Sequence, residues 1–481
     1  MKYRMMIILF FIFLLTRVLF IRNLPIFNDE SIFLYWGSLF AQNFKYWNLP
    51  LIIDGKEPGY TILLGLFLKL PFDAFLIGRF LSVSFAALTL IILLKISQTM
   101  FSKRSLPLIA FFVIINPFLL IFDRLALAES LIALIVTASF YAYIKLRNNP
   151  NRNQALLLGS LLGIGWWVKS TLFLVLPALI FDAVKTIKKT KKKKIAMYHF
   201  FTLFIFLVFV VSLALNRVIN NLSNITLEKT MSFSEIISVP FMTWINNFTT
   251  IVQIFTAYLT PLGAILFLIG VIFALKNKQH RLLIIWIIIP IAMLCLIGKG
   301  ITSRYLFPII PLTVLIMYYG YSILRMYKKT IRCLFVFSTS AIGFLLIVYP
   351  LVFYTHYLRF FPQTQKDFSQ YVKTWSSGYG VQEAANWIKQ NSGSKPTLVL
   401  VRPDFGNPES AMFILLRSNK NIRVLPLNAV PKLTPQELSQ LNILFVSRGV
   451  QFAGLEKIMQ QKIIFKKPLD DEFVGIYSLG L

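Results

Sequence analysis

Two acidic residues stand where the sequence leaves its first apolar run, in the string Asn28-Asp29-Glu30-Ser31. A carboxylate at the edge of a low-dielectric region can hold a hydroxyl group and remove its proton as a general base. A carboxylate in the first turn of a helix also caps that helix and meets its positive dipole end. The pair therefore predicts either a base with a neighbouring acid or a capped helix start.

A third acid follows a short polar turn between two later apolar runs. Asp123 and Arg124 form this turn, and Glu129 begins the unbroken apolar run after it. Ionisable residues slightly below a membrane surface usually face a polar cavity and mark function. The alternative for Glu129 is a buried ion pair with Arg124 or Arg79.

Cations recur at similar turns. Lys56 belongs to the string Lys56-Glu57-Pro58-Gly59-Tyr60, in which proline and glycine predict a tight turn. Arginine binds phosphate through two parallel hydrogen bonds, so such a set would suit a phosphate group. The alternative for Lys56 is a lysine that snorkels to the interface. The cations of the set are Lys56, Arg79, Lys169, Lys299 and Arg304.

The composition indicates a membrane as the surrounding medium. Of 481 residues, 57% are hydrophobic and only 14% are charged, and the mean hydropathy is +0.70. A spanning helix needs roughly 20 mostly apolar residues, and many such runs are present. The first run, residues 5–21, has no small-residue cleavage site after it, and we interpret it as a retained span.

The net charge of +30 follows from membrane topology rather than from nucleic-acid binding. Basic residues gather in cytoplasmic loops, and two apolar spans separate each basic loop from the next. About eleven spans result, with the N-terminus inside and the C-terminus outside. We interpret Lys191–Lys194 as a topology anchor. The basic loops are residues 95–104, 145–152, 185–194, 276–281 and 325–332.

This topology puts nearly all acidic residues of the membrane part on one side. Ten occur before residue 356, and only Asp182 falls inside. Asp and Glu contribute little to orientation, so the bias indicates that chemistry or binding takes place on the outer face. We expect Asp73, Glu228 and Glu235 to be solvated loop residues. The outer acids are Asp29, Glu30, Asp54, Glu57, Asp73, Asp123, Glu129, Glu228 and Glu235.

Two domains are expected, an all-α polytopic membrane domain over residues 1–355 and a small extracytoplasmic α/β domain over residues 356–481. The membrane domain contains a long first outer loop, residues 23–75. After Asn28 this loop shows an amphipathic stretch typical of an interfacial helix. Segments with a helical pattern alternate with strand-like segments in the second domain. They predict helices over residues 382–389 and 410–416 and strands over residues 397–402, 422–427 and 443–447. A further helix is expected to begin at Thr434-Pro435.

Other sites receive little support. Cys295 and Cys333 lie in apolar runs, and the three histidines are far apart, so no zinc site is expected. Asp470-Asp471-Glu472 predicts a solvated turn. Gly378-Tyr379-Gly380 lacks the strand and spacing of a dinucleotide fingerprint, so nucleotide chemistry is not expected. No metal ligands are assigned, and a divalent cation is left open.

An acidic pair, a Lys-x-Pro turn, an Asp-Arg-(x)4-Glu turn and an Arg-Tyr-Leu-x-Pro string occur in this order. The last is Arg304-Tyr305-Leu306-Phe307-Pro308. This order resembles the GT-C membrane glycosyltransferases, specifically the protein O-mannosyltransferase and aminoarabinose-transferase-like group (glycosyltransferase family 39-like), over roughly residues 1–330. Gly159 to Gly163 followed by Lys169 also resembles the Gly-rich span that ends in lysine in this group.

The resemblance implies a sugar donor on polyprenyl or dolichyl phosphate and inverting transfer on the outer face. It implies that Asp29 is the base, that Glu30 is its neighbour, and that Arg304 lies near the lipid phosphate. Lys56 matches the lysine of a Lys-Pro-Pro turn, although Glu57 replaces the first proline here.

The sequence thus predicts a multi-pass cell-membrane enzyme that transfers a hexosyl or pentosyl group to a hydroxyl or amine of a protein, lipid or glycan, among membrane lipids and without nucleic acid. The expected catalytic residues are Asp29, Glu30 and Glu129. The expected substrate- or phosphate-binding residues are Lys56, Tyr60, Arg79, Asp123, Arg124, Lys169, Arg304 and Tyr305. Two alternatives stay open: a transporter or flippase of a lipid-linked sugar precursor, and an enzyme that joins whole lipid-linked oligosaccharides.

Overall fold

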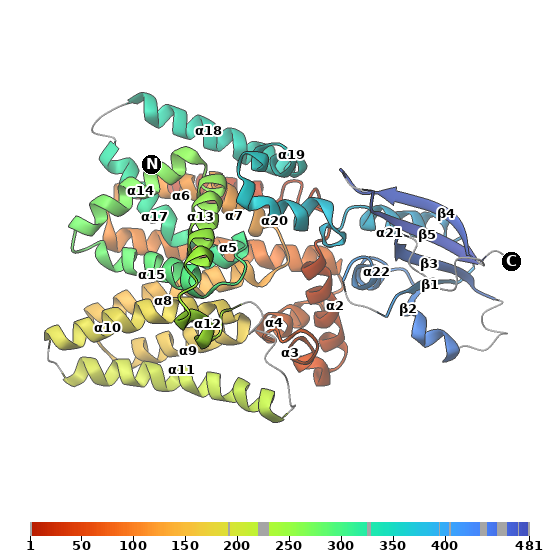
Figure 1. The fold of residues 1–481 in the computed structure, drawn as a ribbon, viewed down its shortest axis with the longest axis horizontal. Coiled ribbons are helices and arrows are strands. Elements are labelled where there is room, and N and C mark those ends of the chain that lie inside the picture. The colour runs from red at the N-terminus through yellow and green to blue at the C-terminus, as the bar shows by residue number, and fades with distance from the viewer. Residues whose placement is uncertain are drawn as a thin grey trace.

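Long helices run side by side along most of the molecule, and a five-stranded sheet lies beyond one end of them (Figure 1). The computed structural model describes residues 2–190, 193–219, 230–324, 329–393, 395–403, 406–432, 440–449, 459–469 and 471–479. Residues 191, 228, 434, 435 and 470, which figure in the sequence predictions, lie outside these ranges.

The helices of the first part of the chain are α1 (Lys2–Val18), α2 (Asn28–Gln42), α3 (Leu49–Asp54), α4 (Gly59–Phe67), α5 (Ala74–Met100), α6 (Leu106–Ile115), α7 (Pro117–Phe122), α8 (Ala128–Asn148), α9 (Arg152–Val168), α10 (Leu176–Thr190) and α11 (Lys193–Ile219). They are followed by α12 (Phe233–Ile237), α13 (Phe241–Tyr258), α14 (Pro261–Lys276), α15 (Arg281–Ile297), α16 (Ser303–Leu306), α17 (Ile310–Leu324), α18 (Lys329–Val348), α19 (Pro350–Thr355) and α20 (Gln365–Phe368).

Five helices of the described part are long and apolar enough to cross a membrane, or up to seven if each of two bent pairs is one span. The spans that contain α5, α8 and α17 are mostly buried, whereas α11 exposes large apolar side chains such as Phe200 and Phe204. A bilayer would cover such side chains. The several apolar helices agree with the expected membrane domain, while the eleven spans and their orientation remain predictions.

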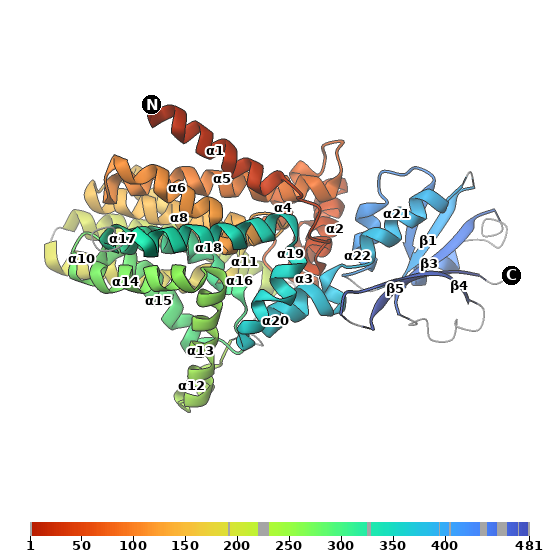
Figure 2. The ribbon, with the colours of Figure 1, turned by 90° about the horizontal axis from the view of Figure 1, so that it is seen from above.

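The start of α1 and the sheet lie at opposite ends of the molecule (Figure 2). The end of α10 and the start of α11, which flank a predicted basic loop, lie at the end remote from the sheet (Figure 1). The start of α2 lies instead at the sheet end, where Asn28 accepts a hydrogen bond from the backbone N–H of Asn407.

Helix α2 forms as expected at Asn28, but it is not an interfacial helix with one face in the headgroups. It packs against α4 on one side and against α22 (Glu409–Leu415) on another. Its buried residues include Leu34 and Ser38 as well as Phe33 and Trp36. The one-sided expectation was wrong because the C-terminal part of the chain covers the other side.

The C-terminal part is the predicted α/β unit. Its helices are α21 (Val381–Asn391) and α22, and its strands are β1 (Thr397–Val401), β2 (Ile422–Pro426), β3 (Asn442–Arg448), β4 (Met459–Lys466) and β5 (Phe473–Leu479). The strand order is β2-β1-β3-β5-β4. Strand β1 pairs in parallel with β2 and β3, whereas β5 is antiparallel to β3 and β4. The two predicted helices and three predicted strands are confirmed, and Asp471 and Glu472 lie in the connection between β4 and β5.

One face of this sheet continues the core of the helical part. Val399 and Val401 of β1 belong to the large apolar cluster that also contains Phe33 and Trp36 of α2. Leu398 and Leu400 point to the opposite face and join a small separate cluster, as the two-residue period of a strand requires. The C-terminal part is therefore packed onto α2 rather than tethered beside it.

Helices α14 and α17 cross at two glycines. A Cβ at Gly320 would lie 2.0 Å from the carbonyl oxygen of Leu266, and one at Gly270 would lie 2.2 Å from that of Ile316. Small residues allow helix backbones to approach closely in membranes.

We predict that Gly320→Ala forces α14 and α17 apart and lowers the free energy of unfolding by about 1–3 kcal/mol, the usual cost of overpacking. The measurement is the thermal unfolding midpoint of the purified protein. Leu268→Ala is the matched control, because Leu268 lies on α14 and is 58% exposed. An unchanged midpoint for Gly320→Ala would contradict the close crossing.

Candidate active site

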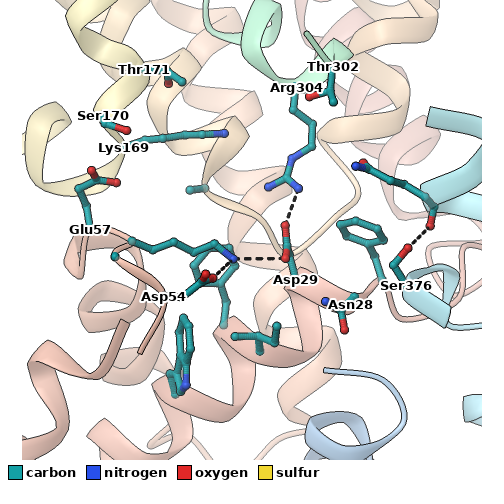
Figure 3. Close-up of a pocket in the computed structure, with 18 of the residues that line it drawn as sticks. Asn28, Asp29, Asp54, Glu57, Lys169, Ser170, Thr171, Thr302, Arg304 and Ser376 are labelled. Atoms are coloured by element: carbon teal, nitrogen blue, oxygen red, sulfur yellow. Dashed lines mark hydrogen bonds and ion pairs between the residues drawn. The ribbon is translucent and has the colours of Figure 1, made fainter. Parts of the chain in front are cut away.

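A cavity of about 700 Å³ lies at the sheet end of the helical part. Five stretches of chain and the single residue Ala128 line it. The stretches are the start of α2 with Phe27, residues 53–57, residues 168–171, residues 302–305 and residues 370–376. Five of the predicted site residues line it together, although more than 270 positions separate the first from the last. They are Asp29, Lys56, Lys169, Arg304 and Tyr305. Figure 3 shows Asp29, Lys169 and Arg304 around the cavity.

Asp29 faces two cations in this cavity. Its carboxylate lies 2.5 Å from Nη1 of Arg304 and 3.3 Å from Nζ of Lys56. Lys56 also contacts Asp54 at 2.6 Å, and its ammonium lies 5.3 Å from the ring centre of Phe33. Lys56 is therefore held within the cavity by two carboxylates rather than extended to the membrane surface.

Glu129 lies directly behind the cavity. Its Oε1 accepts hydrogen bonds from Nε of Arg304 at 2.6 Å and from Nζ of Lys169 at 2.7 Å. The side chain is fully buried, and Oε2 has no hydrogen-bond partner within the described residues. The buried ion pair considered for Glu129 thus exists, but its partners are Arg304 and Lys169 rather than Arg124 or Arg79.

The charges around Asp29 determine its protonation. Burial alone would raise the pKa of Asp29, but the positive charges of Lys56 and Arg304 outweigh burial and hold this pKa below its usual range. Burial likewise opposes the charge of Lys56, and Asp29 and Asp54 overcome it and raise the pKa of Lys56. Asp29 is ionised and Lys56 protonated at neutral pH.

Glu30 has a different role from its neighbour. Its oxygens accept hydrogen bonds from Nε and Nη2 of Arg79, at 2.9 and 2.7 Å, and from the backbone N–H groups of Phe27 and Ala126. Both side chains of the pair are fully buried. Glu30 does not line the cavity, so we revise its expected contact with substrate: it fixes the start of α2 against α5 and thereby aims Asp29.

Arg79 and Arg124 also lie away from the cavity. Arg79 donates hydrogen bonds to the carbonyl oxygens of Ile21 and Leu24 as well as to Glu30. Arg124 donates to the carbonyl oxygens of Leu19, Phe20 and Leu346. Both guanidinium groups bind the ends of helices and loops, which corrects their expected place at a phosphate.

Asp123 and Tyr60 are buried without facing the cavity. Asp123 pairs with Arg17 of α1 at 3.3 Å. The Tyr60 ring packs edge-on against Phe33, with ring centres 5.3 Å apart. Their expected binding roles are therefore corrected to packing roles beneath the site.

The turn after Lys56 is held against the turn that carries Lys169. A Cβ at Gly59 would lie 2.7 Å from the carbonyl oxygen of Trp167, so only glycine permits this approach. Glu57, at the position where the resemblance expects proline, lies 3.6 Å from Arg217 of α11. The two lysines therefore reach one cavity from adjoining turns.

Two ion pairs of the loops predicted to be outer stay apart from the cavity. Lys299 pairs with Glu235 at 2.8 Å, and Arg22 pairs with Asp73 at 2.7 Å. These pairs are solvent-exposed, as expected for Asp73 and Glu235. Among the described residues, no three His, Cys, Asp or Glu side chains gather in a way that would hold a metal ion.

Sequence reasoning missed one wall of the cavity entirely. Residues Gln370, Thr374, Trp375 and Ser376 form it, and they belong to a segment with no motif. The sequence predicts Asp54, which pairs with Lys56, only as one of the outer acids. Its spacing of two residues from Lys56 was the one available signal.

The solved structures that resemble the chain give its fold. ArnT from Cupriavidus metallidurans in the apo state aligns with a TM-score of 0.58 and 10% identity, over 99% of this chain and 98% of that one. The same protein bound to undecaprenyl phosphate aligns with a TM-score of 0.56 and 10% identity, over 98% and 97%. The oligosaccharyltransferase of Archaeoglobus fulgidus, tethered to an acceptor peptide, aligns with a TM-score of 0.55 and 11% identity, over 93% of this chain and 69% of that one. The fold is that of the GT-C membrane glycosyltransferases.

A family model adds sequence evidence for part of the chain. Residues 55–223 match the model described as dolichyl-phosphate-mannose-protein mannosyltransferase. No curated protein sequence gave a match. This match covers about a third of the chain, within the part that has the GT-C fold.

We predict that Glu30→Gln destabilises the protein by about 3–5 kcal/mol, because it leaves the buried charge of Arg79 without its partner. Thermal or denaturant unfolding of the purified protein measures this. Asp73→Asn is the matched control: the Arg22–Asp73 pair is 56% and 45% exposed, asparagine keeps the helix cap, and a surface pair contributes about 0–1 kcal/mol. Equal effects of the two substitutions would argue against the positioning role of Glu30.

Proposed function

We propose that the protein transfers a sugar from a polyprenyl phosphate to a hydroxyl or amine group of an acceptor, with inversion, on the extracytoplasmic side of the cell membrane. The observation that carries the proposal is that Asp29 and three cations, Lys56, Lys169 and Arg304, line one cavity. The neighbours in fold include a protein bound to undecaprenyl phosphate and one tethered to an acceptor peptide.

The cations supply the binding site for the departing phosphate. A sugar phosphate carries its own leaving group, so the enzyme mainly has to stabilise the negative charge that develops on the phosphate oxygens. Arg304 offers a planar fork for this purpose, and the two lysines act as point charges. Glu129 holds Arg304 and Lys169 from behind, so that both are in place before the donor arrives.

The structure also offers a space for the isoprenoid chain of the donor. A second cavity of about 270 Å³ shares Glu57, Ser170, Thr171 and Tyr305 with the first. Its other walls are mainly apolar, and they include Trp166, Phe173, Leu174, Leu294 and Ile297. An isoprenoid chain whose phosphate rests at Lys169 and Arg304 would extend into this space.

Asp29 accepts the proton of the acceptor in this mechanism. The acceptor oxygen or nitrogen forms a bond to the anomeric carbon, its proton passes to the Asp29 carboxylate, and the bond from the anomeric carbon to the phosphate oxygen breaks. The electron pair of that bond leaves with the polyprenyl phosphate. Because the attack comes from the side opposite the leaving group, the anomeric configuration inverts.

Donor binding would also make Asp29 a stronger base. In the free protein Lys56 and Arg304 are paired with Asp29, which keeps its pKa low. A phosphate draws both cations toward itself and adds negative charge nearby, so the pKa of Asp29 rises toward its ordinary range. The base would gain strength only when the donor is in place.

We predict that Asp29→Asn lowers sugar transfer about 10²–10⁴-fold, the range for loss of a general base, while binding of polyprenyl phosphate persists. Arg304→Gln should lower transfer about 10²–10³-fold, as loss of a charge-stabilising donor does, and should weaken polyprenyl phosphate binding. The assay is release of polyprenyl phosphate from lipid-linked sugars. Lys299→Gln is the control, because Lys299 is an outer cation paired with Glu235 rather than a cavity residue.

Wild-type release by Asp29→Asn would refute its role as base. Countertransport of the lipid-linked sugar without any covalent product would favour the transporter or flippase instead.

The pH dependence gives a second test. The profile of kcat/KM reports the free enzyme, and that of kcat reports the bound complex. Since the cations hold the pKa of Asp29 low in the free protein, its carboxylate is lost only at strongly acidic pH, and the acid limb of kcat/KM should lie below that of kcat. Lys56→Met removes one cation, so it should move the acid limb of kcat/KM to higher pH. A limb that moves to lower pH, or stays in place, would contradict this electrostatic account.

A further inference from the structure

The wall formed by Gln370, Thr374, Trp375 and Ser376 has a composition unlike the rest of the cavity. These four residues carry no charge, and they come from the segment between α20 and α21. The other walls carry the carboxylates and cations described above. The cavity therefore has a charged side and a neutral, polar and aromatic side.

Trp375 is the largest group of the neutral wall, and the C-terminal part holds it in place. The guanidinium carbon of Arg448 lies 4.2 Å from the centre of the Trp375 ring, a stacking distance for a cation on an indole. Arg448 in turn lies 2.8 Å from the buried carboxylate of Glu409 and donates a hydrogen bond to the carbonyl oxygen of Asn407. With Arg448 against one face, the Trp375 side chain is still 37% exposed.

The same region of the C-terminal part touches the residue before Asp29. The backbone N–H of Asn407 donates to Oδ1 of Asn28 at 2.8 Å. A Cβ at Gly406 would lie 2.3 Å from that oxygen and 3.0 Å from Cζ3 of Trp375, and Gly406 has a φ of +118°, so glycine is required here. The indole ring is thereby fixed close to the start of α2, which carries the base.

Gln370 provides an unpaired polar atom in this wall. Its Oε1 is buried and has no hydrogen-bond partner within the part of the chain that the structure describes. The neighbouring hydroxyls are already engaged, since Ser376 donates to the carbonyl oxygen of Gln370 and contacts the hydroxyl of Thr374. A buried acceptor without a partner costs roughly 1–3 kcal/mol, which a ligand hydroxyl would recover.

The neutral wall lies across Asp29 from the phosphate side. In Figure 3, Lys169 and Ser376 lie on opposite sides of the Asp29 carboxylate. An inverting transfer brings the acceptor to the face opposite the leaving phosphate. The neutral wall is thus where the acceptor would lie, with the base between the two sides.

We propose, on the basis of the proposed function, that Gln370 and Trp375 form the acceptor subsite and that the acceptor presents a neutral sugar ring. A sugar ring has a face of C–H groups that can pack flat on an indole, and its edge carries hydroxyls that can donate to Oε1 of Gln370. The wall offers no charge to pair with a charged acceptor group. Trp375 is then a specificity-determining residue, and Arg448 is the residue that positions it.

The test measures binding of two probes to the full-length protein in lipid nanodiscs. Maltoside detergents are avoided, because their head group is itself a neutral sugar. One probe is a panel of neutral methyl hexosides and pentosides, followed by saturation-transfer NMR. The other is undecaprenyl phosphate.

We expect the wild type to bind at least one glycoside and Trp375→Ala to weaken that binding by about tenfold or more, a loss of about 1.4 kcal/mol. Trp375→Phe, which keeps an aromatic face, should retain most of the glycoside affinity. Arg448→Ala should lower the glycoside affinity less than Trp375→Ala does. Affinity for undecaprenyl phosphate should stay unchanged in all three variants. Phe360→Ala is the control, because Phe360 is an exposed aromatic side chain outside the cavity.

Three outcomes would overturn the inference. The wild type could bind undecaprenyl phosphate and a serine-containing peptide but no glycoside. Trp375→Ala could weaken the binding of undecaprenyl phosphate as much as the binding of the glycoside, which would put the indole ring on the donor side. Trp375-dependent glycoside binding without any undecaprenyl phosphate binding would instead refute the proposed function, and the assignment as an acceptor subsite would fail with it.

Discussion

Arg304 connects the two carboxylates on which the site depends. One guanidinium group reaches Asp29 through Nη1 and Glu129 through Nε, at 2.5 and 2.6 Å. Removing either carboxylate would leave a buried positive charge short of a partner, which is costly in a low dielectric. The helices that carry these three residues, α2, α8 and α16, are thereby fixed relative to one another around the cavity.

A second buried pair stands beneath this one and keeps its geometry. Glu30 and Arg79 hold the start of α2 against α5, and Glu30 also binds the backbone N–H of Ala126 just before α8. Adjacent residues in the sequence thus do separate tasks. The Asp29 carboxylate faces the cavity, whereas the Glu30 carboxylate accepts its hydrogen bonds from Arg79 and from the backbone N–H groups of Phe27 and Ala126.

The ion pairs in the cavity suit a site in which binding of a phosphate would change the partners of the cations. Lys56, Lys169 and Arg304 face Asp29, Asp54 and Glu129 in the free protein. In the proposed mechanism an entering phosphate would compete for these cations, and Asp29, the carboxylate they release, would act as the base. The C-terminal part closes the opposite side with Trp375 and reaches Asn28 directly, so it is a component of the site rather than an appendage.

The sequence by itself determined the apolar helices, the helix start at Asn28, the α/β unit and the ordered motifs around Asp29, Lys56, Glu129 and Arg304, because hydropathy, periodicity and local turn chemistry are properties of short segments. The resemblance distinguished Asp29 from Glu30 and singled out Arg304, but the residue types alone did not, because the sequence around a charged residue does not show whether its side chain faces a cavity or a helix end. Only the tertiary structure showed which of them line the cavity. It alone brought Trp375 and Gln370 to the cavity, because their place there depends on the packing of distant segments, such as Arg448 against Trp375, and not on any pattern near them in the chain.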